Sequence, residues 1–157
     1  MSAEPVAERP YIAHAEYGIP QDTEGLIEWS WVAERFKAER NFWICTSSPG
    51  GRPHARPTWG VFVEDTVCFG GGPNTRWSRN LAANPRVSIH LESGERVVIA
   101  EGSVDRITDG DDPRLKAIDD AYEAKYDMRH GPPIWLLRPR VVIAWTNFPR
   151  DATRFRF

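Results

Sequence analysis

The sequence predicts a mainly β protein with flanking helices, built as an antiparallel barrel. Short strand-like runs joined by turn residues recur along the 157-residue chain. Helical periodicity is confined to three segments, at residues 23–40, 76–84 and 111–127. Strands that follow one another through hairpins favour an antiparallel barrel over a parallel sheet. The length fits one domain, and we expect an N-terminal arm over residues 1–22 and a single domain over residues 23–157.

The composition excludes several classes of partner. Hydrophobic residues make up 41% of the chain, charged residues 27%, and the net charge is -2, which is typical of a globular protein without a basic field for nucleic acid. No apolar run is long enough to span a membrane, and no apolar signal stretch precedes the arm. Cys45 and Cys68 lie in separate strand-like runs, as buried reduced thiols do. We therefore expect a cytoplasmic protein that binds neither nucleic acid nor membrane.

The N-terminal part of the chain predicts an arm followed by a helix. The first 21 residues carry three prolines and little periodicity, so we expect an extended arm that is partly disordered or lies on a neighbour. Thr23 is the expected cap of a helix that runs to about Arg40. Its apolar residues recur at steps of three and four: Leu26, Trp29, Val32, Ala33 and Phe36. This stripe predicts a helix that covers one end of the core.

The chain is organised around residues 52–85. We expect one strand over residues 54–64, a turn at Glu64 and Asp65, and a second strand over residues 66–70. Three glycines at 70–72 then lead into a helix capped by Asn74 or Thr75 and ended before Pro85. A bare backbone, a helix N-terminus and the arginines at positions 76 and 79 together predict an anion site.

The remaining elements follow from alternation and periodicity. Further strands are expected over residues 41–48, 86–92, 96–108, 134–137 and 141–146. Gly102 inside one of them predicts a bulge or sharp bend. The helix over residues 111–127 has Asp112 as its cap, and its inner stripe is Leu115, Ile118, Ala121 or Tyr122, and Tyr126. The tail, residues 148–157, shows no strand or helix pattern.

The stretch GRPHARPTWGVFVEDTVCFGGGPNTRWSRNLAANPRVSIHLESG resembles the core of the pyridoxamine 5'-phosphate oxidase-like split barrels. The resemblance continues through VVIAEGSV, AYEAKYD, RPRVVIAW and ATRFRF, so it covers roughly residues 34–157, and the most similar branch is the flavin/deazaflavin-dependent oxidoreductases. It implies a six-stranded antiparallel split β-barrel, also called the FMN-binding split barrel. It also implies a homodimer with one flavin-type cofactor, FMN or F-420, in each of two interface grooves.

The resemblance also implies a set of cofactor-binding residues. The segment from Arg56 to Trp59 would run beside the ring, the segment around Thr75 and Arg76 would hold the phosphate, and the partner chain would close the site with Trp145 and its tail. The full set is Arg56, Pro57, Thr58, Trp59, Gly72, Thr75, Arg76, Trp77, Arg79, Asn80, Trp145 and Arg154.

Trp77 departs from the family pattern, because family members often carry lysine at this position. Three alternatives follow for Trp77. The loss of the lysine weakens the attraction for the phosphate, or the indole stacks on the cofactor ring, or the indole packs on the barrel beside Leu81.

Few residues offer catalytic chemistry. No histidine pair has metal-ligand spacing, so we expect no metal, and the sequence contains no Ser-His-Asp order, Walker loop or Rossmann glycine pattern. His54 alternates with Arg56 and Thr58 on one strand face and is the candidate general acid, against the alternative of a structural histidine. No other residue is assigned a catalytic role.

The resemblance implies an oxidoreductase that transfers hydride between bound FMN or F-420 and an unidentified small conjugated substrate. The alternative is a non-catalytic flavin- or ligand-binding or storage protein on the same barrel, because a basic, aromatic-lined groove serves both functions.

Overall fold

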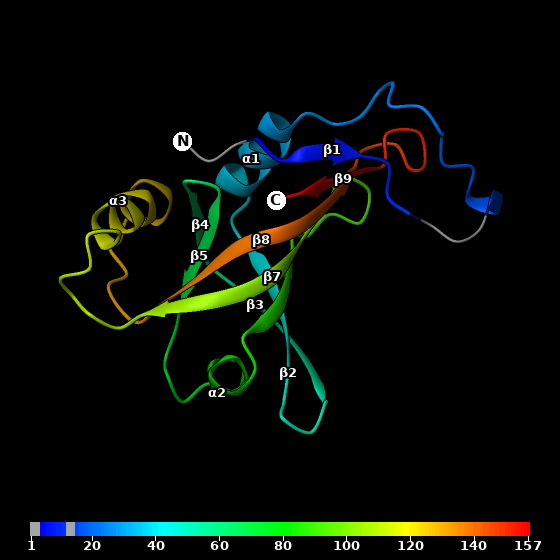
Figure 1. Cartoon of the computed structure of the whole chain (residues 1–157). Coiled ribbons are helices and arrows are strands. Elements are labelled where there is room, and N and C mark those ends of the chain that lie inside the picture. The colour runs from blue at the N-terminus through cyan, green and yellow to red at the C-terminus, as the bar shows by residue number, and fades with distance from the viewer. Residues whose placement is uncertain (1–3, 12–14) are drawn as a thin grey trace.

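Residues 4–11 and 15–157 are described by a computed structural model, in which nine strands form one antiparallel sheet that is flanked by three α-helices (Figure 1). The strands are β1 (Val6–Glu8), β2 (Phe42–Ser47), β3 (Pro53–Thr58), β4 (Gly60–Val63), β5 (Thr66–Gly70), β6 (Arg86–His90), β7 (Val97–Ile107), β8 (Ile134–Trp145) and β9 (Thr153–Arg156). The helices are α1 (Trp29–Ala38), α2 (Arg76–Ala83) and α3 (Leu115–Tyr126), with a 3-10 turn at Ala15–Tyr17.

The strand order closes the sheet into a split barrel. The main path runs β1-β9-β8-β7-β6-β2-β3, and β5 pairs with both β4 and the first half of β8. The predicted class, an antiparallel split barrel with flanking helices, is therefore confirmed. The described residues hold more than six strands, because the arm and the tail each add a short strand and because residues 54–64 divide into two.

Two apolar clusters hold the helices against the barrel. The larger fills the barrel and includes Val32 and Phe36 of α1, with Phe36 stacked on Phe62 at 5.1 Å between ring centroids. The smaller lies between α3 and the β4–β5 hairpin and contains the inner stripe of α3: Leu115, Ile118, Tyr122 and Tyr126. The predicted stripe of α3 and the part of the α1 stripe from Trp29 to Phe36 therefore face the core, whereas Leu26 lies before the helix.

The expected single strand over residues 54–64 is wrong, because the chain changes partners at Trp59. β3 pairs with β2, whereas β4 pairs with β5. Gly60 lies where the chain passes from β3 to β4. A Cβ at this position would lie 2.5 Å from Cδ2 of Phe42, so only glycine fits there. The Tyr126 hydroxyl accepts a bond from the Gly60 amide (3.0 Å) and donates to the Arg40 carbonyl (2.7 Å), which satisfies backbone groups that the ladder leaves unpaired.

The expected break at residues 138–140 is also wrong, since β8 continues for 12 residues through Pro139. Proline has no N–H for a ladder bond, but Pro139 lies opposite Gly102, where the register shifts. The predicted bulge at Gly102 is confirmed, and it allows the proline inside the strand.

The tail is a strand, contrary to the expectation for residues 148–157. Thr153–Arg156 forms β9 between β8 and β1. The Glu8 carboxylate binds Arg154 Nε at 2.8 Å and Arg156 Nε at 2.6 Å, and so fixes β1 of the arm to the tail. The expectation of an extended arm at residues 1–3 and 12–14 lies outside the described residues, and the division into an arm and a domain stays a prediction.

The helix starts differ from expectation at two of the three helices. α1 begins at Trp29 rather than near Thr23, because the preceding segment is bound to the tail: the Ile27 amide donates to Thr153 Oγ1 at 2.8 Å. α3 begins at Leu115, and the Asp112 carboxylate accepts from the Arg114 amide in the turn before it. For α2 the predicted cap Thr75 is confirmed, since its Oγ1 accepts from the Ser78 amide. None of the helices in the described part of the chain has the length and apolar character of a membrane span.

Candidate functional site

Side-chain bonds hold α2 against the strand β2. The Asn80 amide donates to Thr46 Oγ1 at 3.0 Å, and the Asn84 amide donates to Ser47 Oγ at 3.1 Å. Asn80 is buried, so its bond anchors the inner side of the helix. The helix also contacts β3, the last strand on the path of the sheet, and the charge of Arg76 in its first turn acts on His54 of β3.

Where α2 meets β3, the charges of Arg76 on α2 and Arg56 on β3 both act on His54 of β3, and we call these three basic residues the basic notch. Burial and then the positive charges of Arg76 and Arg56 lower the pKa of His54 below its usual value. Both guanidinium groups belong to exposed residues, and neither forms an ion pair within residues 4–11 and 15–157. The notch therefore carries positive charge that no described carboxylate balances, as an anion site requires.

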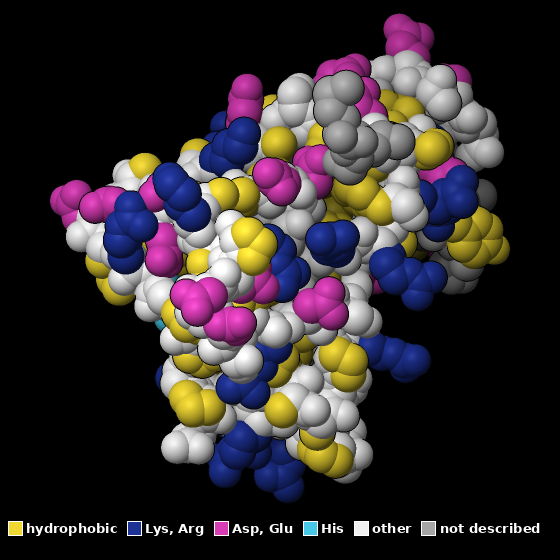
Figure 2. All heavy atoms as spheres, turned by 60° about the vertical axis from the view of Figure 1, so that its left-hand side comes forward, with side chains coloured by type: hydrophobic (Ala, Val, Ile, Leu, Met, Phe, Trp, Pro, Cys, Tyr) yellow, Lys and Arg dark blue, Asp and Glu magenta, His cyan; other side chains and the backbone are white. Residues whose placement is uncertain are grey.

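The start of α2 adds its own preference for an anion. The first amides of a helix have no acceptor inside the helix, and Thr75 takes only that of Ser78. No acidic side chain lies in the first turn, and Arg79, one turn on, is exposed. The free amides of Arg76 and Trp77 and the positive end of the helix dipole thus add to the positive charge that Arg76 brings to this end of α2. Figure 2 shows Lys and Arg side chains gathered at the lower end of the molecule, where Figure 1 places α2.

Trp77 packs on the barrel, which is one of the three alternatives that the sequence left open. Its side chain is 7% exposed and tilts against Phe69 with ring centroids 5.7 Å apart. Gly71 lies so close that a Cβ there would be 2.5 Å from the indole. Gly71 and Gly72 therefore have different surroundings. Gly71 leaves space for the indole of Trp77, whereas Gly72 is exposed near the start of α2.

The segment after the notch presents an aromatic surface. Pro57 is exposed and Thr58 half-buried on β3, and Trp59 follows with 39% of its surface exposed. One face of Trp59 is covered by Tyr126, whose ring lies parallel at 4.6 Å, and the Arg40 guanidinium lies 4.9 Å from the indole. Trp59 can therefore offer a ligand an edge or its other face.

The two late residues of the predicted set do not meet the notch within one chain. Trp145 ends β8 and Arg154 lies on β9, and β7, β6 and β2 separate β8 from β3 in the sheet. Arg154 is already bound to Glu8. A site that combines these residues with the notch has to be built from two chains.

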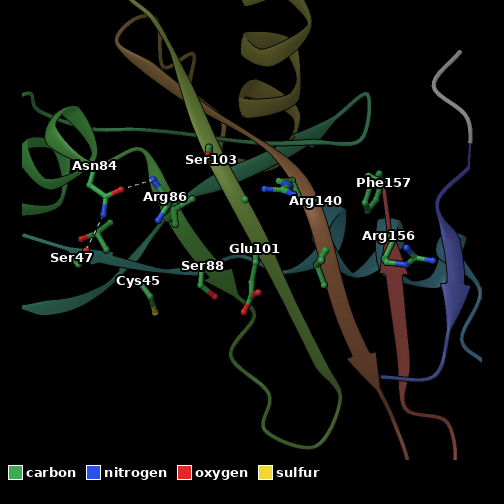
Figure 3. Close-up of a pocket in the computed structure, with 14 residues that line it drawn as sticks. Cys45, Ser47, Asn84, Arg86, Ser88, Glu101, Ser103, Arg140, Arg156 and Phe157 are labelled. Carbon is green, nitrogen blue, oxygen red and sulfur yellow. Dashed lines mark hydrogen bonds between the residues drawn. The ribbon is translucent and has the colours of Figure 1, made fainter. Parts of the chain in front are cut away.

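A groove on the outer face of the sheet was not predicted from the sequence (Figure 3). Its volume is about 770 Å³, and it crosses β2, β6, β7, β8 and β9. The labelled lining residues are Cys45, Ser47, Asn84, Arg86, Ser88, Glu101, Ser103, Arg140, Arg156 and Phe157. Arg86 and Ser88 lie on the face of β6 opposite the buried Val87 and Ile89, but the neighbours of that face depend on strand register.

The register explains the row of side chains in the groove. Cys45 pairs with Ser88, Ser88 with Glu101, and Glu101 with Val141, so these residues lie on one line across the sheet. Burial raises the pKa of Cys45, which keeps its thiol protonated at neutral pH. At one end the Asn84–Ser47 bond joins the groove to α2, as the dashed lines in Figure 3 show.

The other titratable residues have structural partners. His90 stacks on Trp43 with the rings 3° from parallel, as expected for a structural histidine. Cys68 is buried, and burial raises its pKa to about 12. Within residues 4–11 and 15–157, no group of three or more His, Cys, Asp or Glu side chains could hold a metal ion.

Fold and site together define an antiparallel split barrel with a basic notch beside α2 and a polar groove on the sheet. Residues 31–146 match the family model described as pyridoxamine 5'-phosphate oxidase, and the chain belongs to this family. A search of curated proteins finds no match.

Similar solved structures share the fold. A conserved hypothetical protein from Mycobacterium tuberculosis is 19% identical, with 80% of this chain and 89% of that chain covered and a TM-score of 0.65. An F420 reductase is 20% identical over 69% and 93% of the two chains, with a TM-score of 0.55. The heme storage protein HutZ from Vibrio cholerae is 14% identical over 73% and 92%, with a TM-score of 0.61. At these identities the likeness concerns the fold alone, and the structures include both an enzyme and a storage protein.

Proposed function

We propose that this protein is an oxidoreductase that binds a phosphate-bearing flavin-type cofactor, FMN or F-420, and transfers hydride between it and a small conjugated substrate. The observation that carries the proposal is the basic notch, where uncompensated Arg56 and Arg76 lie beside the free amides of α2. Charge-assisted bonds from guanidinium groups and helix amides are the usual means by which proteins hold a phosphate. Family membership supports the same reading.

The residues of the notch fit a phosphate, and those after it fit a ring. Arg76 and Arg79 would bind the phosphate from the helix, and Arg56 from the strand. Pro57, Thr58 and Trp59 would line the edge of the ring, where they exclude water. Thr75 holds the helix start in place, and Asn80 anchors the helix to β2. When bound, the cofactor supplies the hydride chemistry, so the chain itself needs no nucleophile.

His54 has a defined part in this proposal. Its lowered pKa leaves the imidazole mainly neutral at neutral pH in the free protein. A bound phosphate would add negative charge nearby, raise the pKa and favour the protonated ring. His54 then could donate a proton to a substrate or a hydrogen bond to the phosphate, according to where the ligand lies.

The proposal includes a homodimer with the cofactor between the chains. β3 has one unpaired edge in the described chain, and its outer residues are exposed. The groove face also carries the half-exposed Phe157, and at the other end of β9 Trp145 and Phe148 contact each other with ring centroids 5.3 Å apart. Aromatic residues of this kind favour interface cores. A partner chain could bring its Trp145 and tail to the notch, which a single chain does not do.

The test is cofactor binding followed by turnover. The purified protein is titrated with FMN and with F-420, and any chromophore retained from expression is identified by absorbance and mass spectrometry. We expect one of the two to bind, and its reduced form to be oxidised by a conjugated acceptor such as an enone. Binding without turnover of any acceptor would favour the non-catalytic binding or storage alternative. Failure of both cofactors to bind, with heme bound instead, would reject the proposal.

A further inference from the structure

The side chain of Trp59, which directly follows β3, is held in place by Tyr126 at the end of α3. The two rings lie 5° from parallel with their centroids 4.6 Å apart, and we call them the ring pair. Tyr126 is itself fixed, because its hydroxyl accepts a bond from the Gly60 amide at 3.0 Å and donates to the Arg40 carbonyl at 2.7 Å. Since Tyr126 is also buried, the ring that supports the indole is fixed by the core.

The outer face of the indole is accessible. Tyr126 covers the inner face, yet 39% of the Trp59 surface is exposed. The Arg40 guanidinium carbon lies 4.9 Å from the centre of the indole and 5.4 Å from the centre of the Tyr126 ring. Because these two distances are nearly equal, the guanidinium lies beside the ring pair and not over the outer face of the indole. A planar ligand can therefore stack on that face.

The charge beside the ring pair is positive. Arg40 is exposed, and its guanidinium forms no ion pair with any residue in the described part of the chain. The neighbouring Glu39 cannot neutralise it, because that carboxylate is bound to Arg35. Lys125 adds a second positive charge, since its ammonium lies 5.4 Å from the centre of the Tyr126 ring. These charges favour an anionic ligand.

The two cations also act on each other. Burial, with a smaller effect of the Arg40 charge, lowers the pKa of Lys125 to about 8. Like charges that lie near each other without an anion disfavour the charged form of the group that can lose its proton. An anion bound at Arg40 would offset this repulsion, so the surroundings of the ring pair favour a carboxylate at the exposed guanidinium.

We propose that Trp59 and Arg40 bind a planar conjugated carboxylate, with its ring on the outer face of the indole and its carboxylate at the guanidinium. A ring stacked on the indole has its edge near Arg40, because the guanidinium lies beside the same indole. The planar guanidinium offers a carboxylate two parallel N–H donors. Tyr126 is a positioning residue, since it holds the indole. That this ligand is the conjugated substrate rests on the proposed function, whereas its binding does not.

The test is calorimetric titration of the full chain, without cofactor, with cinnamate. Cinnamamide is the neutral planar ligand, and cyclohexanepropionate is the saturated carboxylate with the same number of carbon atoms. We expect cinnamate to bind at least about tenfold more tightly than cinnamamide, because only the carboxylate forms charge-assisted bonds. It should bind about fivefold more tightly than cyclohexanepropionate, because only the planar ring stacks on the indole.

Variants separate the two contacts. Arg40→Gln should make the affinities for cinnamate and cinnamamide equal, and Trp59→Leu should weaken cinnamate binding by about fivefold. Trp59→Phe should restore most of the binding, because it returns an aromatic face. The first control is Arg138→Gln, at an exposed arginine without an ion pair among the residues that the structure describes. The second is Trp43→Leu, whose indole stacks on His90. Both controls should bind cinnamate as the native protein does, and melting temperatures show that each variant is folded.

Equal affinity of the native protein for cinnamate and cinnamamide would overturn the proposal, and so would equal affinity for cinnamate and cyclohexanepropionate. Cinnamate binding that survives both Arg40→Gln and Trp59→Leu would place the ligand elsewhere and overturn it, as would no binding at millimolar concentration. Because these titrations use no cofactor, cinnamate binding that depends on Trp59, together with failure of FMN and F-420 to bind, would reject the proposed function alone.

Discussion

At the scale of residues, His54 reports on the charge in the notch. Its pKa is lowered by burial and then by Arg76 and Arg56. The unfolded chain therefore binds a proton at His54 more readily than the folded chain does. As the pH falls below the usual histidine pKa of 6.5, protonation of His54 lowers the free energy of unfolding. We expect an NMR titration to give a pKa below 6.5 for His54, and a higher value in Arg76→Ala or when FMN is bound. A pKa that is insensitive to both changes would show that the notch does not concentrate charge at His54.

Trp77 gives the second prediction at this scale. Because the indole is buried against Phe69, Trp77→Ala should lower the free energy of unfolding by about 3–5 kcal/mol, measured by urea denaturation. Trp77→Lys should also destabilise the fold and should not tighten cofactor binding. The partly exposed Trp59 serves as the control, and its alanine variant should cost less stability. Native stability in Trp77→Lys together with tighter, salt-sensitive binding would support the missing-lysine alternative instead.

At the scale of elements, the bulge at Gly102 allows β8 to run unbroken through Pro139. A Cβ at this position would lie 2.7 Å from the Arg138 carbonyl and 2.8 Å from Leu137 Cδ1. Gly102→Ala should therefore cost about 1–3 kcal/mol of stability, as overpacking does. Gly94→Ala is the matched control, because nothing lies within 4 Å of a Cβ there. Equal melting temperatures for the two variants would mean that the strands move apart without strain.

Local patterns predicted the elements whose signal lies within one segment. The stripes of α1 and α3, the cap at Thr75, the turn at Glu64 and Asp65, and the bulge at Gly102 all follow from neighbouring residues. β1 could not be predicted this way, because its three residues form a strand only by pairing with β9 at the other end of the chain. β9 is a short strand that follows β8 after a loop and pairs with both β8 and β1. The groove could not be predicted from local patterns either, because its line of side chains depends on the register of β2, β6 and β7.

At the scale of the whole molecule, we expect a homodimer. Light scattering should give twice the 17.9 kDa chain mass at micromolar concentration. The physical reasons are the unpaired edge of β3 and the separation of Trp145 and Arg154 from the notch. If a strict monomer were found to bind the cofactor, the late residues would have no part in the site.

The sequence resemblance identified the family and predicted a phosphate end, yet it placed residues with different surroundings in one set. Arg56 and Arg76 lie together in the notch, whereas Trp77 and Asn80 are buried and Arg154 is bound to Glu8. Spacing along a helix cannot tell which face the barrel covers, and the ion pair with Glu8 joins segments nearly the whole chain apart. The cofactor-binding roles of the individual residues stay predictions.

The measurement that tests the central claim most directly is the dissociation constant of the bound cofactor for the native protein, Arg76→Ala and Lys116→Ala. The control is Lys116→Ala, which removes the same charge from the exposed side of α3. The exposed ion pair of Lys116 with Asp120 contributes little to stability, so its loss should not disturb the fold. If Arg76 binds the phosphate, its loss should weaken binding by at least about tenfold, since a hydrogen bond to a charged group contributes on the order of 1.5–3 kcal/mol. Lys116→Ala should bind as the native protein does. Equal affinity for all three proteins, measured by fluorescence titration, would contradict a phosphate site in the notch.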